Sequence, residues 1–186
     1  MPRIQPLTPE LAQGHAKDLL NDVKKKIGMV PNLMRTMAQS PAVLQAYLQF
    51  NDALASGELP RKHRELIAVS VGQSNECNYC VSAHSAIGKS IGLTAEELMD
   101  ARLGHGFDRQ SDALIRFARS VVENRGQATE EDFAEVRDAG FSDGEIAEIV
   151  AHVALNTFTN YFNLVAGTEI DFPLAPELEG KKRNAA

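Results

Sequence analysis

Signals that start and stop helices recur along the whole chain, and they constrain its fold more than any other feature. A capping residue stands before a proline or an acid, as the first turn of a helix favours, in Thr8-Pro9-Glu10, Ser40-Pro41, Thr94-Ala95-Glu96-Glu97 and Ser142-Asp143-Gly144-Glu145. Gly28, Gly57 and Pro60 are placed to end or interrupt helices. Alternating apolar patterns and hairpin turns, which would indicate strands, are scarce.

Between these signals the apolar residues recur with helical spacing. We therefore predict an all-α, single-domain fold of about seven or eight helices. The expected helices include a first one that ends near Ile27, one that follows Pro41, a densely apolar one over 62–74, and further ones over 108–124, 130–139 and 143–165. The two most apolar, 62–74 and 144–165, are candidates for the core or for a subunit interface.

Composition excludes several classes of function. Acids and bases are spread along a chain of 186 residues with net charge −6, which argues against a nucleic-acid surface. No apolar run reaches the roughly 18 residues of a membrane span, and the first residues lack the apolar core of a signal peptide. We therefore expect a cytoplasmic protein with no membrane association. The short basic run 181–183 is expected to be a frayed tail.

Cys77-Asn78-Tyr79-Cys80 is a C-x-x-C motif, and His84 follows it. At about 100° per residue, the two cysteines and the histidine share one face of a helix that begins near residues 75–77. The start of such a helix favours the thiolate form of cysteine. Three interpretations stay open: a redox dithiol, a zinc site completed by His84 with His63 or Glu65, and two small buried apolar residues.

Each neighbour of this motif has a functional and a structural interpretation. Glu65 lies on the preceding apolar helix, where a partly desolvated carboxylate can exchange protons near neutral pH, or it pairs with Arg61 or Arg64 at the surface. His84 is a catalyst or a satisfied structural residue. Asn75 is expected to cap the helix, and Tyr79 to pack. Three further histidines are expected to be structural or exposed: His15, His105 and His152.

Several segments together resemble a known family. The spacing Glu-x(11)-Cys-x-x-Cys-x-x-x-His over Glu65, Cys77, Cys80 and His84 resembles the alkylhydroperoxidase AhpD-like family of the carboxymuconolactone decarboxylase superfamily. Residues 28–33, Ser40-Pro41 and 156–163 also resemble its peroxidase-related subgroup. The resemblance implies an AhpD-like helical domain over 25–168, with a helical N-terminal extension over 1–24 and a tail over 169–186.

The resemblance also implies roles. Cys80 would be the thiolate that attacks a hydroperoxide, Cys77 the resolving thiol, and the pair would form a redox disulfide. Glu65 and His84 would form the proton relay, with no metal and no cofactor. The family's relay histidine between the cysteines is replaced here by Tyr79. An external dithiol, from a lipoyl protein, a thioredoxin-like protein or a small thiol, would restore the enzyme, and a homo-oligomer, trimer or hexamer, is expected.

Two alternatives to a peroxidase remain at this point. A lactone enzyme of the carboxymuconolactone decarboxylase type would use Glu65 and His84 as acid and base without the cysteines. A non-catalytic redox switch would use the dithiol to change the assembly of the protein.

Overall fold

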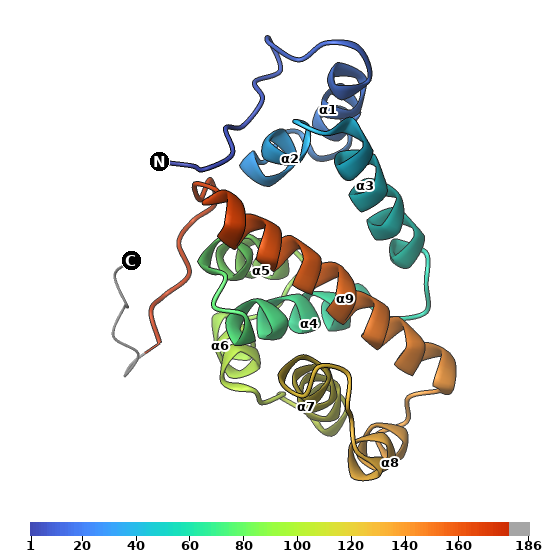
Figure 1. Ribbon diagram of the computed structural model, residues 1–186. Coiled ribbons are helices and arrows are strands. Elements are labelled where there is room, and N and C mark those ends of the chain that lie inside the picture. The colour runs from blue at the N-terminus through green and yellow to red at the C-terminus, as the bar shows by residue number, and fades with distance from the viewer. Residues whose placement is uncertain (179–186) are drawn as a thin grey trace.

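The computed structural model describes residues 1–178, and over these residues the fold is all-α, as predicted (Figure 1). Within this range it has nine helices rather than seven or eight: α1 Gly14–Ile27, α2 Asn32–Met37, α3 Pro41–Ala55, α4 Arg61–Ser74, α5 Asn78–Ser90, α6 Ala95–Leu103, α7 Arg109–Glu123, α8 Glu130–Asp138 and α9 Asp143–Ala166. The expected tail 181–183 lies outside the described residues.

Local capping explains several helix boundaries. Thr94 and Ser142 accept the backbone N–H groups of Glu97 and Glu145, whose side chains bond back, so both predicted capping boxes are present. Gly28 ends α1 with φ of 81°, a left-handed conformation that favours glycine. None of the helices among residues 1–178 is long and apolar enough to cross a membrane.

The first helix begins later than predicted. The Thr8-Pro9 signal produces only a short turn in which the Thr8 carbonyl accepts the N–H groups of Leu11 and Ala12, and α1 starts at Gly14. The segment before it is held by distant partners instead, since Arg3 N–H bonds the Ala166 carbonyl at 2.7 Å and Leu7 N–H bonds the Arg35 carbonyl at 2.9 Å. Tertiary contacts here outweigh a local start signal.

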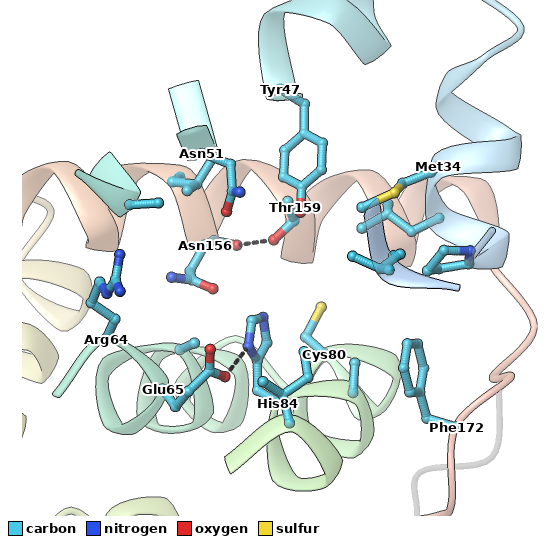
Figure 2. Close-up of a pocket in the computed structure, with 18 of the residues that line it drawn as sticks. Met34, Tyr47, Asn51, Arg64, Glu65, Cys80, His84, Asn156, Thr159 and Phe172 are labelled. Atoms are coloured by element: carbon cyan, nitrogen blue, oxygen red, sulfur yellow. Dashed lines mark hydrogen bonds and ion pairs between the residues drawn. The ribbon is translucent and has the colours of Figure 1, made fainter. Parts of the chain in front are cut away.

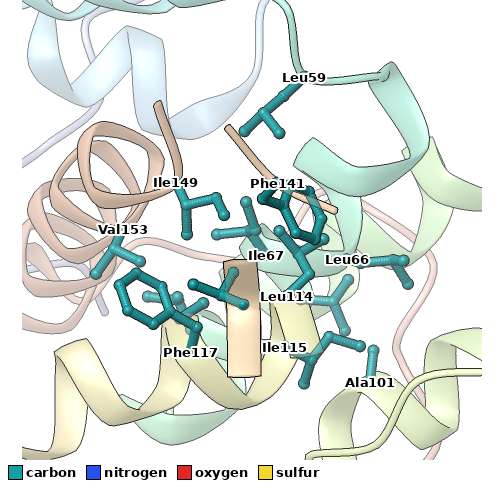
Figure 3. Close-up of a cluster of buried hydrophobic side chains, with 14 of the residues drawn as sticks. Leu59, Leu66, Ile67, Ala101, Leu114, Ile115, Phe117, Phe141, Ile149 and Val153 are labelled. Carbon is teal, nitrogen blue, oxygen red and sulfur yellow. The ribbon is translucent and has the colours of Figure 1, made fainter. Parts of the chain in front are cut away.

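Helix α4 is the centre of the molecule. It packs against α5, α6, α7 and α9, and its residues from Leu66 to Gly72 are all buried. On one side lies a core built mainly from α4, α6, α7 and α9, with Leu66, Ile67, Leu114 and Ile149 among its fully buried side chains (Figure 3). Burying each such side chain contributes about 1.5–3 kcal/mol, so this core fixes α4 firmly.

A second apolar cluster joins α1, α2 and α3 to α5, and it includes Leu20, Met37 and Leu44 together with both cysteines. Helix α9 runs diagonally across the molecule, past α4 and α5 and up to the N-terminal helices (Figure 1). The segment from 168 to 178 then turns back beside α5, where Ala175 N–H bonds Ser82 Oγ at 3.1 Å. The functional residues predicted from the sequence lie where α3, α4, α5 and α9 meet.

Candidate active site

The turn between α4 and α5 places the first cysteine. The N–H of Glu76 bonds the Gln73 carbonyl and the N–H of Cys77 bonds the Gly72 carbonyl, which is the hydrogen-bond pattern of a Schellman motif. Glu76 takes the left-handed position of this motif, with φ of 56°. The chain therefore leaves α4 abruptly and delivers Cys77 to the N-cap of α5.

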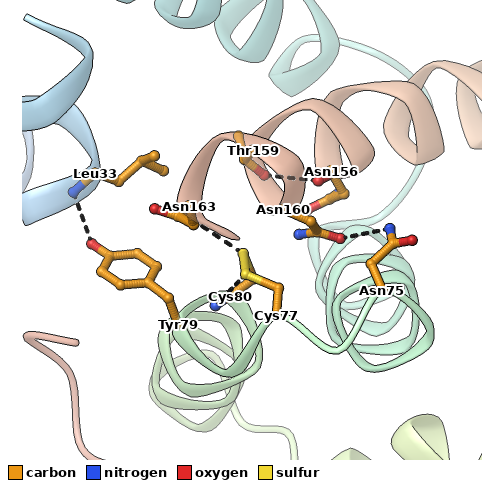
Figure 4. Close-up of a disulfide and its surroundings, with 9 residues drawn as sticks. All are labelled: Leu33, Asn75, Cys77, Tyr79, Cys80, Asn156, Thr159, Asn160 and Asn163. Carbon is orange, nitrogen blue, oxygen red and sulfur yellow. Dashed lines mark hydrogen bonds between the residues drawn. A yellow bond between two sulfur atoms is a disulfide. The ribbon is translucent and has the colours of Figure 1, made fainter. Parts of the chain in front are cut away.

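Cys77, not Asn75, caps α5, so the prediction for Asn75 was wrong. The Cys77 sulfur accepts the backbone N–H of Cys80 at 3.3 Å. Asn75 is the C-cap of α4, and its side-chain amide donates to Asn160 Oδ1 on α9 at 2.9 Å (Figure 4). The amide thus ties the α4–α5 turn to α9 instead of satisfying the helix start.

The two cysteine sulfurs are bonded to each other in this structure (Figure 4). Their Cα atoms are 5.3 Å apart, within the ordinary range for a disulfide, and both residues are almost fully buried. Asn163 of α9 donates its amide N–H to the Cys80 sulfur at 3.3 Å. Cys80 therefore has a polar partner from a second helix that Cys77 lacks among the described hydrogen bonds.

The side chains of Glu65 and His84 contact each other and are mostly shielded from solvent. Glu65 Oε2 lies 2.8 Å from His84 Nδ1, and the two side chains are 14% and 26% exposed. Neither Arg61 nor Arg64 forms an ion pair with Glu65 among the described residues. His84 follows Cys80 by one helical turn, so the histidine and the sulfur lie on the same face of α5.

A cavity of about 710 Å³ opens onto this group of side chains. Cys80, Glu65 and His84 line it, while Cys77 does not (Figure 2). The structure thus brings three of the four predicted residues to one cavity and keeps the fourth behind them, bonded to Cys80. Hydrogen-bond donors and acceptors of α3 and α9, including Asn51, Asn156 and Thr159, complete the polar part of the wall.

Tyr79 is a structural residue on the cavity wall. Its hydroxyl oxygen accepts the backbone N–H of Leu33 at 3.2 Å, and its ring packs edge-on against Phe172. Burial is the main cause that raises the pKa of Tyr79, so the phenol stays protonated at neutral pH. The expectation that Tyr79 packs is therefore met, and its side chain joins α5 to α2 and to the C-terminal segment.

His152 was expected to be structural or exposed, but the structure places it in the wall of the same cavity. Burial lowers the pKa of His152 to about 4, and the positive charge of Arg64 acts in the same direction. The imidazole is therefore neutral at neutral pH. His15 and His105 are exposed, as expected.

Sequence reasoning missed Asn156, Thr159 and Asn163, which α9 presents to the cavity together with His152. The signal was available, because positions 152, 156, 159 and 163 recur at helical spacing within an otherwise apolar helix.

The sequence had also left a zinc site open as an interpretation of the cysteines. Within residues 1–178 no three His, Cys, Asp or Glu side chains converge so that they could hold a metal ion.

Comparisons with known proteins agree with this fold. The model of the carboxymuconolactone decarboxylase family matches residues 41–124. A curated relative, an alkyl hydroperoxide reductase of Mycobacterium tuberculosis, is 26% identical over 92 residues, which are 49% of this chain. The matched part is only 27% of that protein, so this chain spans about a quarter of its length.

Solved structures match over almost the whole chain. The alkylhydroperoxidase AhpD core of an uncharacterized peroxidase-related protein from Ralstonia eutropha JMP134 superposes with a TM-score of 0.83 and 26% identity, and 91% of this chain covers 92% of that one. The debrominase Bmp8, solved with 2,3,4-tribromopyrrole, superposes with a TM-score of 0.77 at 20% identity over 90% and 91% of the two chains, which shows the fold alone. In its fold, its motif and its family match, this chain is similar to the AhpD-like proteins of the carboxymuconolactone decarboxylase superfamily.

Proposed function

We propose that this protein is a cysteine-dependent peroxidase of the alkyl hydroperoxide reductase type. The observation that carries the proposal is the set of contacts around Cys80. Its sulfur is bonded to Cys77, accepts a hydrogen bond from Asn163, and borders a cavity that Glu65 and His84 also line. A thiol with a partner for disulfide formation and a proton acceptor one turn away has what a peroxidase cycle requires.

The first step oxidises Cys80. In the reduced protein the Glu65–His84 pair takes the thiol proton, and the Cys80 thiolate attacks the terminal oxygen of the hydroperoxide. The O–O bond breaks, the S–O bond forms, and the alkoxide leaving group takes the proton back to become an alcohol. Cys80 becomes a sulfenic acid, having given two electrons to the peroxide.

The second step forms the disulfide. The Cys77 sulfur attacks the Cys80 sulfur, the S–O bond breaks, and the oxygen leaves as water with the Cys77 proton. An external dithiol, from a lipoyl protein, a thioredoxin-like protein or a small thiol, then reduces the disulfide and is itself oxidised. Since Cys80 is the cysteine that lines the cavity, we expect the incoming thiol to attack its sulfur. The cytosol, where such reductants are kept, is the proposed location.

The test uses reduced protein treated with cumene hydroperoxide, and mass spectrometry follows each cysteine. We expect a Cys77–Cys80 bridge in the wild type, and in Cys77→Ser a Cys80 sulfenic acid that dimedone traps. Cys80→Ser should form neither product. The peroxidase proposal fails if the wild type forms neither a bridge nor a sulfenic acid and turns over no peroxide with any dithiol.

The Glu65–His84 contact also supports a second candidate, a lactone enzyme of the carboxymuconolactone decarboxylase type. A carboxylate and an imidazole 2.8 Å apart in a cavity wall can act as acid and base without any sulfur. Replacing both cysteines by serine separates the two functions. Turnover of a lactone acid would survive that double substitution, whereas peroxide reduction would be lost.

A further inference from the structure

The size of the cavity points beyond small peroxides. Its volume of about 710 Å³ lies within the roughly 300–1,000 Å³ typical of pockets that bury organic ligands of drug size. A water molecule in the liquid takes up only about 30 Å³, and hydrogen peroxide is little larger. The cavity therefore has room for an organic molecule much larger than hydrogen peroxide.

The two sides of the cavity differ in chemistry. Met34 and Phe172 lie on the Cys80 side (Figure 2). Leu33 also lines the cavity and belongs to the same apolar cluster as Cys80. Arg64 lies on the other side, beyond Glu65 and His84, and Asn51 lies across the cavity from Glu65 (Figure 2). The reactive sulfur is therefore placed between an apolar wall and a polar, cationic one, so a bound molecule with one apolar and one polar end would pass over it.

The charged residues of the wall leave a positive charge without an acidic partner. Of the two carboxylates that line the cavity, Asp52 pairs with Lys26 and Glu65 contacts His84. Arg61 and Arg64, one turn apart on α4, form no ion pair with any residue of the described range 1–178. His152 stays neutral at neutral pH and adds no charge to this end.

Arg64 is also held in place. Its Nη1 donates to the Leu54 carbonyl at 3.4 Å, and the side chain is only partly exposed. The nearby acid of α9, Glu148, does not neutralise it by a direct contact, because its two oxygens accept the backbone N–H groups of Glu58 at 2.8 Å and Leu59 at 2.9 Å. A half-buried guanidinium with donors to spare is suited to bind a carboxylate, whose two oxygens match its planar geometry.

We propose that the cavity takes an amphipathic organic hydroperoxide that carries a carboxylate, with Arg64 binding the carboxylate and the apolar wall at Met34 and Phe172 binding the hydrocarbon. The hydroperoxide group, between these ends, meets Cys80. This inference rests on the peroxidase function proposed above, and it names the class of substrate for that site. Fatty-acid hydroperoxides, with the peroxide in mid-chain, have this order of groups.

The kinetic test compares 13-hydroperoxyoctadecadienoic acid with its methyl ester, both below their critical micelle concentrations, in the wild type, Arg64→Gln and Arg64→Lys. We expect kcat/KM for the acid to exceed that for the ester by about ten-fold or more, the size of effect that one charge-assisted hydrogen bond provides. Arg64→Gln should bring this ratio close to one, and Arg64→Lys should retain part of it. Arg109→Gln, an exposed arginine far from the cavity, is the matched control and should keep the wild-type ratio.

A binding measurement keeps the inference separate from the peroxidase proposal. Linoleate, which has no peroxide, should bind the oxidised protein in calorimetry and bind Arg64→Gln about ten-fold more weakly. If cumene hydroperoxide and both lipid substrates are all left unreduced, the peroxidase function is wrong even where linoleate binds. If the wild type reduces acid and ester equally well and Arg64→Gln binds linoleate unchanged, the carboxylate site is wrong and the peroxidase stands.

Discussion

Asn163 distinguishes the two sulfurs of the motif. Its amide N–H points at Cys80 and comes from α9, more than eighty residues away in the chain. A hydrogen bond donated to sulfur stabilises the thiolate more than the thiol, because the acceptor then carries a full charge. This contact favours Cys80 as the attacking thiolate, in agreement with its position on the cavity wall.

Replacing Asn163 by leucine should make Cys80 less reactive. In the Cys77→Ser background, we expect the midpoint of the alkylation rate by iodoacetamide, plotted against pH, to move upward by about one unit, the equivalent of one charge-assisted hydrogen bond. Asn156→Ala is the control, because Asn156 bonds the His152 carbonyl and no sulfur. An unchanged profile in Asn163→Leu would show that this contact does not act on the thiolate.

His152 should make stability depend on pH. Its folded-state pKa is about 4, and that of an exposed histidine is about 6.5, so below pH 6.5 the unfolded chain takes up a proton that the folded chain refuses. The free energy of unfolding therefore falls as pH falls from about 6.5 toward 4, by about 2 kcal/mol at pH 5 from this residue.

Urea unfolding of wild type and His152→Gln at pH 7.5 and pH 5 measures the contribution of His152 to the free energy of unfolding. The loss of stability between the two pH values should be about 2 kcal/mol smaller in His152→Gln. His105→Gln changes an exposed histidine and should lose as much as the wild type. His63, whose pKa burial also lowers, is present in all three proteins and cancels in the comparison. Equal losses in wild type and His152→Gln would contradict the assignment.

At the scale of elements, the sequence predicted well what is determined locally. The capping boxes at Thr94 and Ser142, the stop at Gly28 and the start at Pro41 all lie where expected, because each depends on side chains within one turn. The short α2 and the late start of α1 could not be predicted. The segment around Leu7 follows hydrogen bonds to α2 that no local pattern encodes.

The same division applies to the site. That Cys77, Cys80 and His84 lie close together could be predicted from the helical period, because all three belong to α5 or to its N-cap. The contact of His84 with Glu65 could not, because it depends on how α4 packs against α5. Asn75 shows the limit most clearly. An asparagine before a helix normally indicates a cap, but here a third helix competes for its amide, and a cysteine takes the N-cap.

Asn75 should stabilise the corner between α4 and α5. Asn75→Ala leaves the oxygen of Asn160, a fully buried side chain, without its donor, at an expected cost of about 1–3 kcal/mol in the free energy of unfolding. Chemical denaturation measures this loss. Asn21→Ala, on the exposed surface of α1, should change stability by less than about 0.5 kcal/mol. If the two substitutions cost the same, the amide pair does not hold the corner.

At the scale of the whole molecule, the two most apolar helices have different roles. The sequence left open whether 62–74 and 144–165 belong to the core or to an interface. Helix α4 is buried on all sides from Leu66 to Gly72, whereas α9 is buried on one side only. Its other side exposes an apolar stripe, defined by Val150, Phe158, Tyr161, Leu164 and Val165, which are 41–64% exposed.

The α9 stripe should be the contact between copies of this chain. From residue 149 to 168 the sequence has no Asp, Glu, Lys or Arg, so no charge opposes close approach, and an uncharged apolar helix face of this length is unusual on a monomer. We expect sedimentation velocity to show a homo-oligomer, a trimer or hexamer by resemblance to the family, and Tyr161→Lys with Val165→Lys to dissociate it. Leu103→Lys with Phe107→Lys places the same charges on exposed apolar residues outside the stripe and should leave the assembly intact.

Dissociation should also affect the active site, because α9 presents Asn156 and Asn163 to the cavity. We expect a measurable change in the rate of Cys80 alkylation when the oligomer dissociates. Monomeric wild-type protein at micromolar concentration would overturn the assignment of the stripe.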